Sequence, residues 1–269
     1  MSSPLRQPLL QTLRDLRAAT VFLTRLPVAW PGDAPADQLA RAAAHFPAVG
    51  AALGAAAGLL GWAVASLGAP LWLAAGLAIA ALAVATGGLH EDGLADFADG
   101  LGGGTTREAK LAIMRDSQIG SYGALALVFA VLLRTAAAAP LMGSAAGIAV
   151  LAMAAAASRA AMTGVFWALP PARADGLAAA NRPCRVRVLV AGGWALAVTL
   201  VFGLPLLGLG AGAAAGAAVL ILAGMAALAV ALVARRALGG HTGDVLGAVQ
   251  QVAEIAALAG AATVIGGLG

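Results

Sequence analysis

Long apolar runs restrict the fold of this chain more than any motif does. A helix rises 1.5 Å per residue, so about 20 apolar residues cross the roughly 30 Å of hydrocarbon in a membrane. Hydrophobic residues make up 61% of the sequence and charged residues only 10%, against about 25% charged in an ordinary soluble domain. We therefore predict an all-α fold, a polytopic integral membrane bundle of about seven transmembrane helices. The predicted spans are 46–67, 70–89, 121–142, 146–169, 188–208, 211–234 and 247–268.

The sequence divides into two regions. Residues 1–45 are expected to form a cytoplasmic amphipathic segment, and residues 46–269 a single transmembrane domain. Apolar side chains recur near helical spacing in the first region, with Arg14 and Arg17 opposite them. Such a helix is typical of segments that lie on a membrane surface with the apolar face in lipid. In the first span, the glycines between residues 50 and 61 predict a face where two helices pack closely.

The positions of Lys and Arg predict the orientation in the membrane. The loops on one side of the seven predicted spans carry Lys or Arg, whereas the connections 68–69, 143–145 and 209–210 carry none. Because positively charged loops stay in the cytoplasm, the N-terminus is expected there and the C-terminus outside. We therefore expect a multi-pass protein of the cytoplasmic (inner) membrane whose polar motifs face the cytoplasm.

Residues 86–104 concentrate acidic side chains in an otherwise weakly charged chain. If this stretch is helical, Asp92, Asp96 and Asp99 recur at i, i+4 and i+7 and share one face. Neighbouring carboxylates repel unless a cation neutralises them, and Mg²⁺ binds oxygen ligands while leaving positions for substrate phosphates. We therefore expect these residues to bind Mg²⁺, with Glu91 as a further candidate ligand. The alternative, a solvated acidic helix end, would normally include lysines.

Three arginines are expected inside the membrane or at its surface, where a positive charge is stabilised by an anionic partner or by water. Arg134 and Arg159 fall inside predicted spans, which costs roughly 2.5–3.5 kcal/mol each unless the charge is paired or hydrated. Arg159 is expected to face a water-filled cavity open to the cytoplasm and to bind a substrate phosphate, in preference to a structural ion pair. Arg134 is expected to have a structural or snorkelling role. Arg25 is expected at the membrane surface, where a lipid headgroup and a substrate phosphate are equally good partners.

Two further segments, 113–123 and 239–247, bring glycine and charged residues to the start of the third and seventh spans. Backbone N–H groups at such helix starts bind phosphate well. Their polar residues are Arg115 and Asp116 in the first segment, and His241, Thr242 and Asp244 in the second. Because both segments are expected on the same side of the membrane as residues 86–104, the second is interpreted as another half of one site.

Six blocks of the sequence, in order along the chain, are shared with a known enzyme family. They are residues 22–28, 45–50, 87–100, 113–123, 158–159 and 240–248. Together they resemble the cobalamin synthase family, adenosylcobinamide-GDP ribazoletransferase. The resemblance implies a Mg²⁺-dependent transfer of adenosylcobinamide phosphate from its GDP linkage to α-ribazole or its 5′-phosphate, with release of GMP. This reaction is the last assembly step of cobalamin biosynthesis.

The resemblance and the residue chemistry together suggest roles for individual side chains. A metal held by the acidic cluster would neutralise the pyrophosphate, and a basic side chain would deprotonate the attacking ribose 3′-hydroxyl. The metal ligands would be Asp92, Asp96, Asp99 and Glu91, with Asp116 completing the shell. The substrate would be bound by Arg25, Arg115, Arg159 and Thr242. The base would be His90, His241 or Asp244, a choice that spacing leaves open.

Two other functions share some of these features. A CDP-alcohol phosphatidyltransferase also uses metal-bound pyrophosphate, but its motif requires an Arg that is absent after Asp92 and Gly93. A transporter would place acidic residues near the middle of the membrane, whereas here only Glu254 is expected well inside a span. The expected partners are the corrinoid nucleotide, α-ribazole and membrane lipids, with no nucleic acid and with oligomerisation left open.

Overall fold

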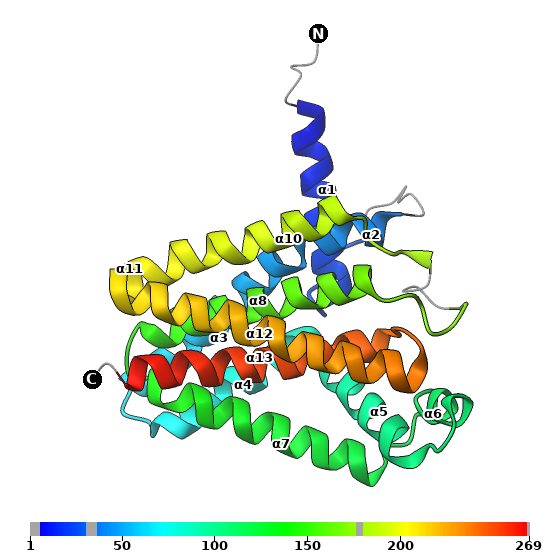
Figure 1. Cartoon of the computed structure of the whole chain (residues 1–269). Coiled ribbons are helices and arrows are strands. Elements are labelled where there is room, and N and C mark those ends of the chain that lie inside the picture. Colours follow the sequence, from blue (N-terminus) through cyan, green and yellow to red (C-terminus); the bar gives the residue numbers. More distant parts are fainter. Residues whose placement is uncertain (1–5, 31–36, 176–179, 268–269) are drawn as a thin grey trace.

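The structure is a computed structural model that describes residues 6–30, 37–175 and 180–267, and within these ranges it contains helices and no strand (Figure 1). Six helical segments of the described chain are long and apolar enough to span a membrane. They are Gln38–Ser66, Ser121–Leu141, Ala146–Ala168, Arg185–Leu207, Leu209–Leu238 and Gly243–Gly266. A bent pair, Leu71–Thr86 with Leu89–Gly103, makes up to seven if it counts as one span. The predicted all-α bundle of about seven spans is confirmed.

The elements begin and end close to the predicted boundaries, with two exceptions at the N-terminal side. In chain order they are α1 (Arg6–Leu23), α2 (Gln38–Ala42), η1 (Ala43–His45), α3 (Phe46–Ser66), α4 (Leu71–Thr86), α5 (Leu89–Gly103), α6 (Arg107–Ile113), α7 (Ser121–Ala138), η2 (Ala139–Leu141), α8 (Ala146–Ala168), α10 (Arg185–Val198), η3 (Thr199–Gly203), α11 (Leu204–Leu207), α12 (Leu209–Leu238) and α13 (Gly243–Gly266). The first exception is the first span, which begins at Gln38 rather than residue 46 because α2 and η1 continue into α3.

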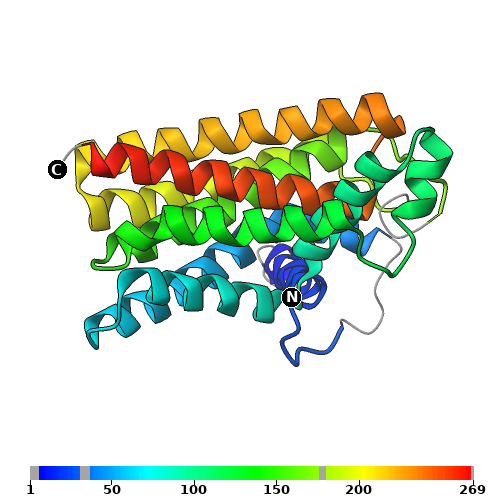
Figure 2. The same ribbon diagram turned by 90° about the horizontal axis from the view of Figure 1, so that it is seen from below.

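The second exception is the predicted span 70–89, which is shorter than expected because α4 ends at Thr86. Gly87 and Gly88 follow α4 with φ angles of +65° and +70°, a left-handed conformation that glycine adopts without the steric penalty of a side chain. Two such residues in succession end the helix, and α5 leaves at 90° to α4. The acidic helix therefore runs across the bundle toward α6 instead of continuing along it (Figure 2).

Close packing of α3 against α8 forms the centre of the bundle. A Cβ atom built on Gly54 would lie 2.3 Å from the carbonyl oxygen of Leu151, and one on Gly50 would lie 2.5 Å from that of Ala155. The two backbones can approach this closely only because glycine has no side chain. The prediction of a glycine packing face is confirmed, and α8 becomes the most buried of the candidate spans.

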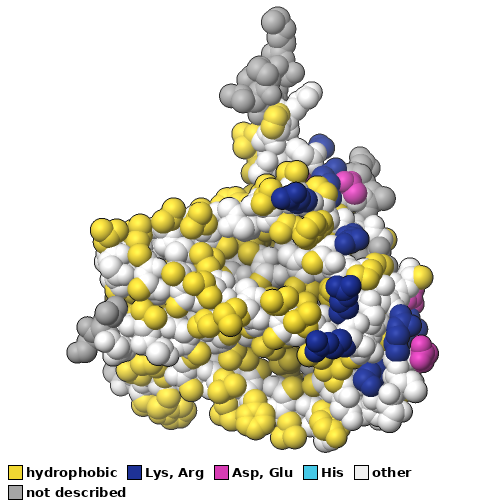
Figure 3. Space-filling view, viewed as in Figure 1, with side chains coloured by type: hydrophobic (Ala, Val, Ile, Leu, Met, Phe, Trp, Pro, Cys, Tyr) yellow, Lys and Arg dark blue, Asp and Glu magenta, His cyan; other side chains and the backbone are white. Residues whose placement is uncertain are grey.

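Charged side chains gather at one end of the bundle. Figure 3 shows Lys and Arg concentrated there, while the rest of the visible face is mostly apolar. At this end lie α5, α6, and the segments that lead into α7, α10 and α13. The described C-terminal end of α13 lies at the opposite end of the bundle (Figure 1). The basic loops that were predicted to share one side of the membrane thus lie at the same end of the folded bundle.

The helix α1 projects away from the bundle, roughly across the direction of the spans (Figure 1). Its base is held by Asp15, which accepts a hydrogen bond from Gln38 at 2.7 Å and forms an ion pair with Arg41 at 3.3 Å. Farther out, Leu9 and Leu13 are exposed. The predicted amphipathic helix is therefore present, and its leucines remain free to contact lipid.

Candidate functional site

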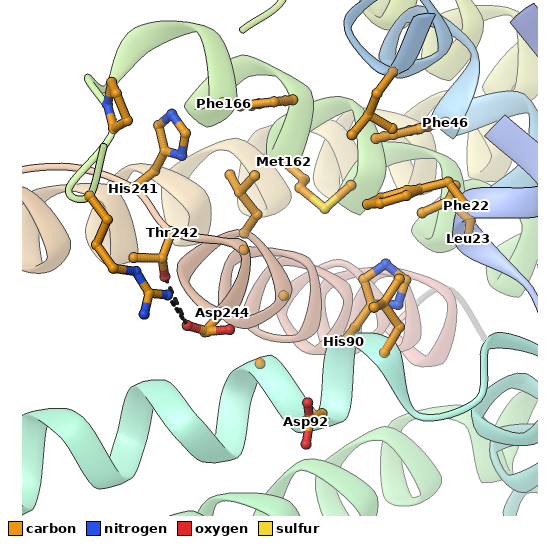
Figure 4. Close-up of a pocket in the computed structure, with 18 of the residues that line it drawn as sticks. Phe22, Leu23, Phe46, His90, Asp92, Met162, Phe166, His241, Thr242 and Asp244 are labelled. Carbon is orange, nitrogen blue, oxygen red and sulfur yellow. Dashed lines mark hydrogen bonds and ion pairs between the residues drawn. The ribbon is translucent and has the colours of Figure 1, made fainter. Parts of the chain in front are cut away.

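A cavity of about 450 Å³ opens at the charged end of the bundle. Its polar wall is formed by His90, Asp92, Arg115, Arg173, Asp175, His241, Thr242 and Asp244. Its apolar wall includes Phe22, Leu23, Leu39, Phe46, Met162, Phe166 and Leu246 (Figure 4). The cavity thus brings together six of the residues that were predicted from sequence: His90, Asp92, Arg115, His241, Thr242 and Asp244.

The segments 86–104 and 239–247 meet because α5 and α13 cross where each has a glycine, Gly93 and Gly247. A Cβ atom on Gly93 would lie 2.9 Å from the backbone oxygen of Asp244 and 3.2 Å from the Cα of Gly247. A side chain at either glycine would separate the helices. The direct backbone contact places Asp92 at the start of α5 and Asp244 at the start of α13 in the walls of one cavity. The interpretation of residues 239–247 as the other half of one site agrees with this geometry.

Asp244 is held in a defined orientation at the start of α13. Thr242 caps this helix by accepting a hydrogen bond from the backbone N–H of Val245 at 3.2 Å. The Thr242 hydroxyl also donates to Asp244 Oδ2 at 3.1 Å, and Arg173 Nη2 contacts the same oxygen at 3.1 Å. Both of these hydrogen bonds use Oδ2 of Asp244, and within the described chain its other carboxylate oxygen accepts none, so that oxygen is available to a ligand in the cavity.

The carboxylates around the cavity suit a Mg²⁺ ion that is shared with a substrate. Asp92 is exposed, Asp96 is partly buried, and the charges of Asp92 and Asp244 both act on Asp96. Among the residues that the structure describes, no three His, Cys, Asp or Glu side chains form a preassembled metal cluster. Mg²⁺ is commonly bound by one or two carboxylates together with water and substrate phosphates. Asp92 and Asp244 line the cavity and fit that type of site, whereas Asp96 lies near them without lining the cavity.

Two of the predicted metal ligands have other partners. The carboxylate of Asp99 accepts hydrogen bonds from the backbone N–H groups of Gly120 at 2.7 Å and Gly123 at 2.8 Å, so it joins α5 to the start of α7. Glu91 Oε1 lies 2.9 Å from Arg134 Nη1 and accepts a hydrogen bond from Gln251 at 3.0 Å. Neither residue lines the cavity. The prediction that they face the same metal site as Asp92 is corrected: helical spacing gave the direction of each side chain but not the neighbouring helix.

Arg159 does not reach the cavity either. It is fully buried, and its Nη1 lies 3.5 Å from Glu254 Oε2 and donates to the Ala155 carbonyl at 3.1 Å. Glu254 Oε1 also lies 2.9 Å from Arg134 Nη2. The space between these groups has no room for a water molecule. The expectation of a water-filled, phosphate-binding position for Arg159 is therefore replaced by a buried ion pair, because α13 supplies a carboxylate at the same depth. The structural role expected of Arg134 is confirmed.

This geometry changes what we expect of Arg159→Lys. An ammonium keeps the charge but does not reproduce the fixed directions of the guanidinium donors, so hydrogen bonds inside the bundle should be lost. We expect a loss of stability of roughly 1–3 kcal/mol, with an unchanged KM for the corrinoid nucleotide. Thermal unfolding in detergent and steady-state kinetics measure the two effects. A higher KM without a lower melting temperature would show that Arg159 binds substrate.

Three other predicted residues lie near the cavity or outside it. Arg115 lines the cavity and forms an exposed ion pair with Asp175. Asp116 is exposed outside the cavity, where its Oδ1 accepts a hydrogen bond from the backbone N–H of Gln118 at 3.0 Å. The exposed side chain of Arg25 lies over Gly87, at the bend between α4 and α5, and does not line the cavity. The structure therefore does not bring Asp116, which was expected to complete the metal shell, into the cavity.

His241 is a buried histidine in the cavity wall. Its backbone is fixed by hydrogen bonds with Pro170 and Ala172, each of 2.8 Å, and its ring packs edge-on against Phe166. Neither ring nitrogen has a hydrogen-bond partner within the described part of the chain. Burial, and to a smaller extent the positive charge of Arg182, lowers the pKa of His241 from 6.5 to about 4. At neutral pH this residue is therefore an uncharged imidazole with a free nitrogen.

The lowered pKa of His241 predicts an acid-sensitive fold. Between pH 6.5 and about 4 the unfolded chain binds a proton at this residue that the folded chain does not bind. The free energy of unfolding should therefore fall as the pH falls through this range, by about 3 kcal/mol in total. Melting temperatures at pH 7 and pH 5 check this result. In His241→Gln the drop between the two pH values should be smaller, and an equal drop would contradict the prediction.

Several cavity residues were not predicted from sequence. Arg173 belongs to a basic loop whose charges were interpreted only as a topology signal. Phe22 and Phe46 lie in blocks 22–28 and 45–50, but an apolar side chain in an apolar chain gives no local signal of binding. Met162 and Phe166 follow Arg159 by about one and two turns of α8. Only the arrangement of α1, α3 and α8 around α13 reveals these residues as one wall.

Comparisons with known proteins agree with the family resemblance of the sequence blocks. The sequence model of the family described as cobalamin-5-phosphate synthase matches residues 15–262. A protein of Azorhizobium caulinodans named adenosylcobinamide-GDP ribazoletransferase is 47% identical over 262 residues, covering 92% of this chain and 95% of that protein. Proteins of the same name from Bradyrhizobium diazoefficiens and Mesorhizobium japonicum are 43% and 41% identical, and the alignments cover 91% and 92% of this chain and 92% of each relative. No solved structure matches the chain. By sequence and by length, this chain belongs to the cobalamin-5-phosphate synthase family.

Proposed function

We propose that this enzyme transfers adenosylcobinamide phosphate from adenosylcobinamide-GDP to α-ribazole or α-ribazole 5′-phosphate. The 3′-hydroxyl oxygen of the acceptor ribose bonds to the phosphorus attached to the corrinoid. The bond from that phosphorus to the bridging oxygen of the pyrophosphate breaks, and GMP leaves with the bridging oxygen. The hydroxyl proton passes to a base on the protein. Phosphoryl transfer of this kind depends mainly on positioning and on compensation of negative charge.

One observation carries the proposal: the acidic starts of α5 and α13 and the basic residues Arg173 and Arg115 line a single cavity. Asp92 and Asp244 would hold a Mg²⁺ ion, with Asp96 close by. Such an ion, when bound, screens the pyrophosphate charge and stabilises the leaving GMP. The two guanidinium groups can each bind a pair of phosphate oxygens, so they would orient the pyrophosphate at the mouth of the cavity.

His241 is the proposed acceptor of the hydroxyl proton. It is neutral at pH 7, and both of its nitrogens are free of partners in the described chain. Asp244 is a poorer candidate because Arg173 and Thr242 already occupy one of its carboxylate oxygens. A base must lie within hydrogen-bonding reach of the proton that it removes, and His241 lies in the same cavity wall as Thr242 and Asp244 (Figure 4).

The assay that tests this function supplies purified enzyme with adenosylcobinamide-GDP, α-ribazole and Mg²⁺, and measures GMP and the joined corrinoid. We expect one GMP for each corrinoid joined, no product without the acceptor, and loss of product after chelation of the metal. Release of CMP from a CDP-activated lipid, without GMP release from the corrinoid substrate, would instead support a phosphatidyltransferase. A transporter role has less support, because the buried charges around Glu254 are paired and leave no room for water.

We further propose that the charged end faces the cytoplasm of a bacterial inner membrane, since Lys and Arg gather there. The single cysteine of the chain, Cys184, is exposed at this end, at the start of α10. A membrane-impermeant thiol reagent should therefore label Cys184 only after the cells are opened. In the double variant Cys184→Ser with Ser144→Cys, the new thiol lies in the uncharged connection between η2 and α8 and should be labelled in intact cells. Labelling in the reverse order would invert the topology.

A further inference from the structure

The apolar wall of the cavity has no role in the transfer chemistry described above. Besides Leu39 and Leu246, it includes Phe22 and Leu23 of α1, Phe46 of α3, and Met162 and Phe166 of α8. The rings of Phe22 and Phe46 are stacked, with centroids 5.6 Å apart and planes 7° apart. None of these side chains carries a charge or a strong hydrogen-bonding group, so this wall suits a flat apolar molecule rather than a phosphate.

His90 adds one polar group beside this wall. Its ring is buried and points to the side of the cavity where Phe22 and Leu23 lie (Figure 4). The Nε2 atom has no hydrogen-bond partner among residues 6–30, 37–175 and 180–267. A buried polar atom without a partner is costly, and a ligand that offers one complementary group would satisfy it. The wall and His90 together describe a site for an apolar ring system with a single polar atom.

We propose that this part of the cavity binds the base of the acceptor nucleoside and selects a benzimidazole over a purine. The inference rests on the proposed function. A benzimidazole attached to ribose has one free ring nitrogen, which can accept a hydrogen bond from His90 Nε2, and its remaining edge is apolar. Guanine and adenine carry several donors and acceptors that this wall would leave unpaired, which disfavours them strongly. The ribose then extends toward Asp92, Asp244 and His241, where its hydroxyl reacts.

The size of the cavity supports the same assignment. Cavities of about 300–1,000 Å³ enclose a ligand of drug-like size, and this cavity of about 450 Å³ matches a nucleoside. A corrin ring with its side chains is several times larger than a nucleoside. The corrin must therefore remain outside the cavity mouth, while its pyrophosphate reaches Arg115 and Arg173 at the polar wall. Acceptor and donor enter from different sides of the reacting phosphorus, as an in-line displacement requires.

The test uses two sets of variants of the full-length enzyme in detergent. Phe22→Ala opens the apolar wall, and His90→Leu removes the hydrogen bond. Each should raise the KM for α-ribazole about tenfold or more, while the KM for adenosylcobinamide-GDP stays within about twofold of the wild type. Met162→Gln keeps the length of the side chain and adds an amide for a purine edge, with Met162→Leu as its volume control. Relative kcat/KM should shift toward an adenine riboside in Met162→Gln only.

Direct binding separates this inference from the proposed function. Calorimetric titration of α-ribazole alone, without corrinoid, should show binding to the wild type and at least tenfold weaker binding to Phe22→Ala and His90→Leu. If the wild type releases no GMP but this binding pattern is found, the proposed function fails and the acceptor site stands. If GMP is released but the variants change the KM of the corrinoid instead of that of α-ribazole, the acceptor site is overturned. Retained melting temperature identifies variants that fold, and Met162→Gln provides the test if Phe22→Ala does not fold.

Discussion

Asp92→Asn is expected to reduce GMP release at least about a hundredfold while the protein remains folded and inserted. Replacing groups that merely support a metal ligand usually costs 10–100-fold, so loss of a ligand itself should cost more. The side chain is exposed in the cavity wall and forms no ion pair with another residue that the structure describes. The asparagine of the variant should therefore leave the packing of α5 intact. The measurement is steady-state GMP release at saturating Mg²⁺, together with the melting temperature.

Asp116→Asn is the matched control for that experiment. Both residues are exposed aspartates at the charged end of the bundle, but Asp116 lies outside the cavity in the turn before α7. Its amide should therefore retain activity within a few-fold of the wild type. If Asp92→Asn turns over normally and Asp116→Asn does not, the catalytic carboxylate belongs to the turn, and the cavity is not the reaction site.

Arg134→Met is expected to destabilise the folded protein by about 3–5 kcal/mol, because it leaves buried carboxylates without their cation. Arg134 is 2% exposed and lies 2.9 Å from both Glu91 and Glu254, so it joins α5 to α13 through α7. Because Glu91 stands between His90 and Asp92, the same loss should disturb the cavity. Thermal unfolding in detergent measures the stability, and acceptor binding measures the effect on the site.

Arg236→Met is the control for charge and side-chain size. Arg236 is exposed in the last turn of α12, where a cation contributes only about 0.3–1 kcal/mol through the helix dipole. The triple variant Arg134→Met, Glu91→Gln and Glu254→Gln removes the buried charges together and should recover part of the lost stability. If Arg134→Met unfolds at the same temperature as Arg236→Met, the buried ion pairs do not hold α5 in place.

Local features of the sequence predicted much of the fold. Apolar runs of membrane length predicted the number of spans, because each span satisfies its own backbone hydrogen bonds and needs no distant partner to be identified. The spacing of glycines in the first span predicted the packing face on α3, because the positions of small residues along one helix can be read from the local sequence. The charged loops predicted which segments share an end of the bundle, since each crossing reverses the side. Of the residues predicted from sequence, Asp92 in the acidic stretch and His241, Thr242 and Asp244 near the far end of the chain line the same cavity.

The tertiary structure decided which charged side chains face the cavity and which are bound inside the protein. Asp92 and Asp99 are alike in sequence, yet Asp92 faces the cavity and Asp99 accepts hydrogen bonds at the start of α7. Arg159 lacked any obvious partner because Glu254 is 95 residues away along the chain, although the two side chains lie 3.5 Å apart. The apolar wall likewise combines side chains from α1, α3 and α8. Hydropathy and helical spacing depend on neighbouring residues, whereas ion pairs and cavities depend on contacts between helices that are distant in sequence. The sequence alone therefore determined the spans and the chemical character of the site. Helix packing determined which side chains line the cavity.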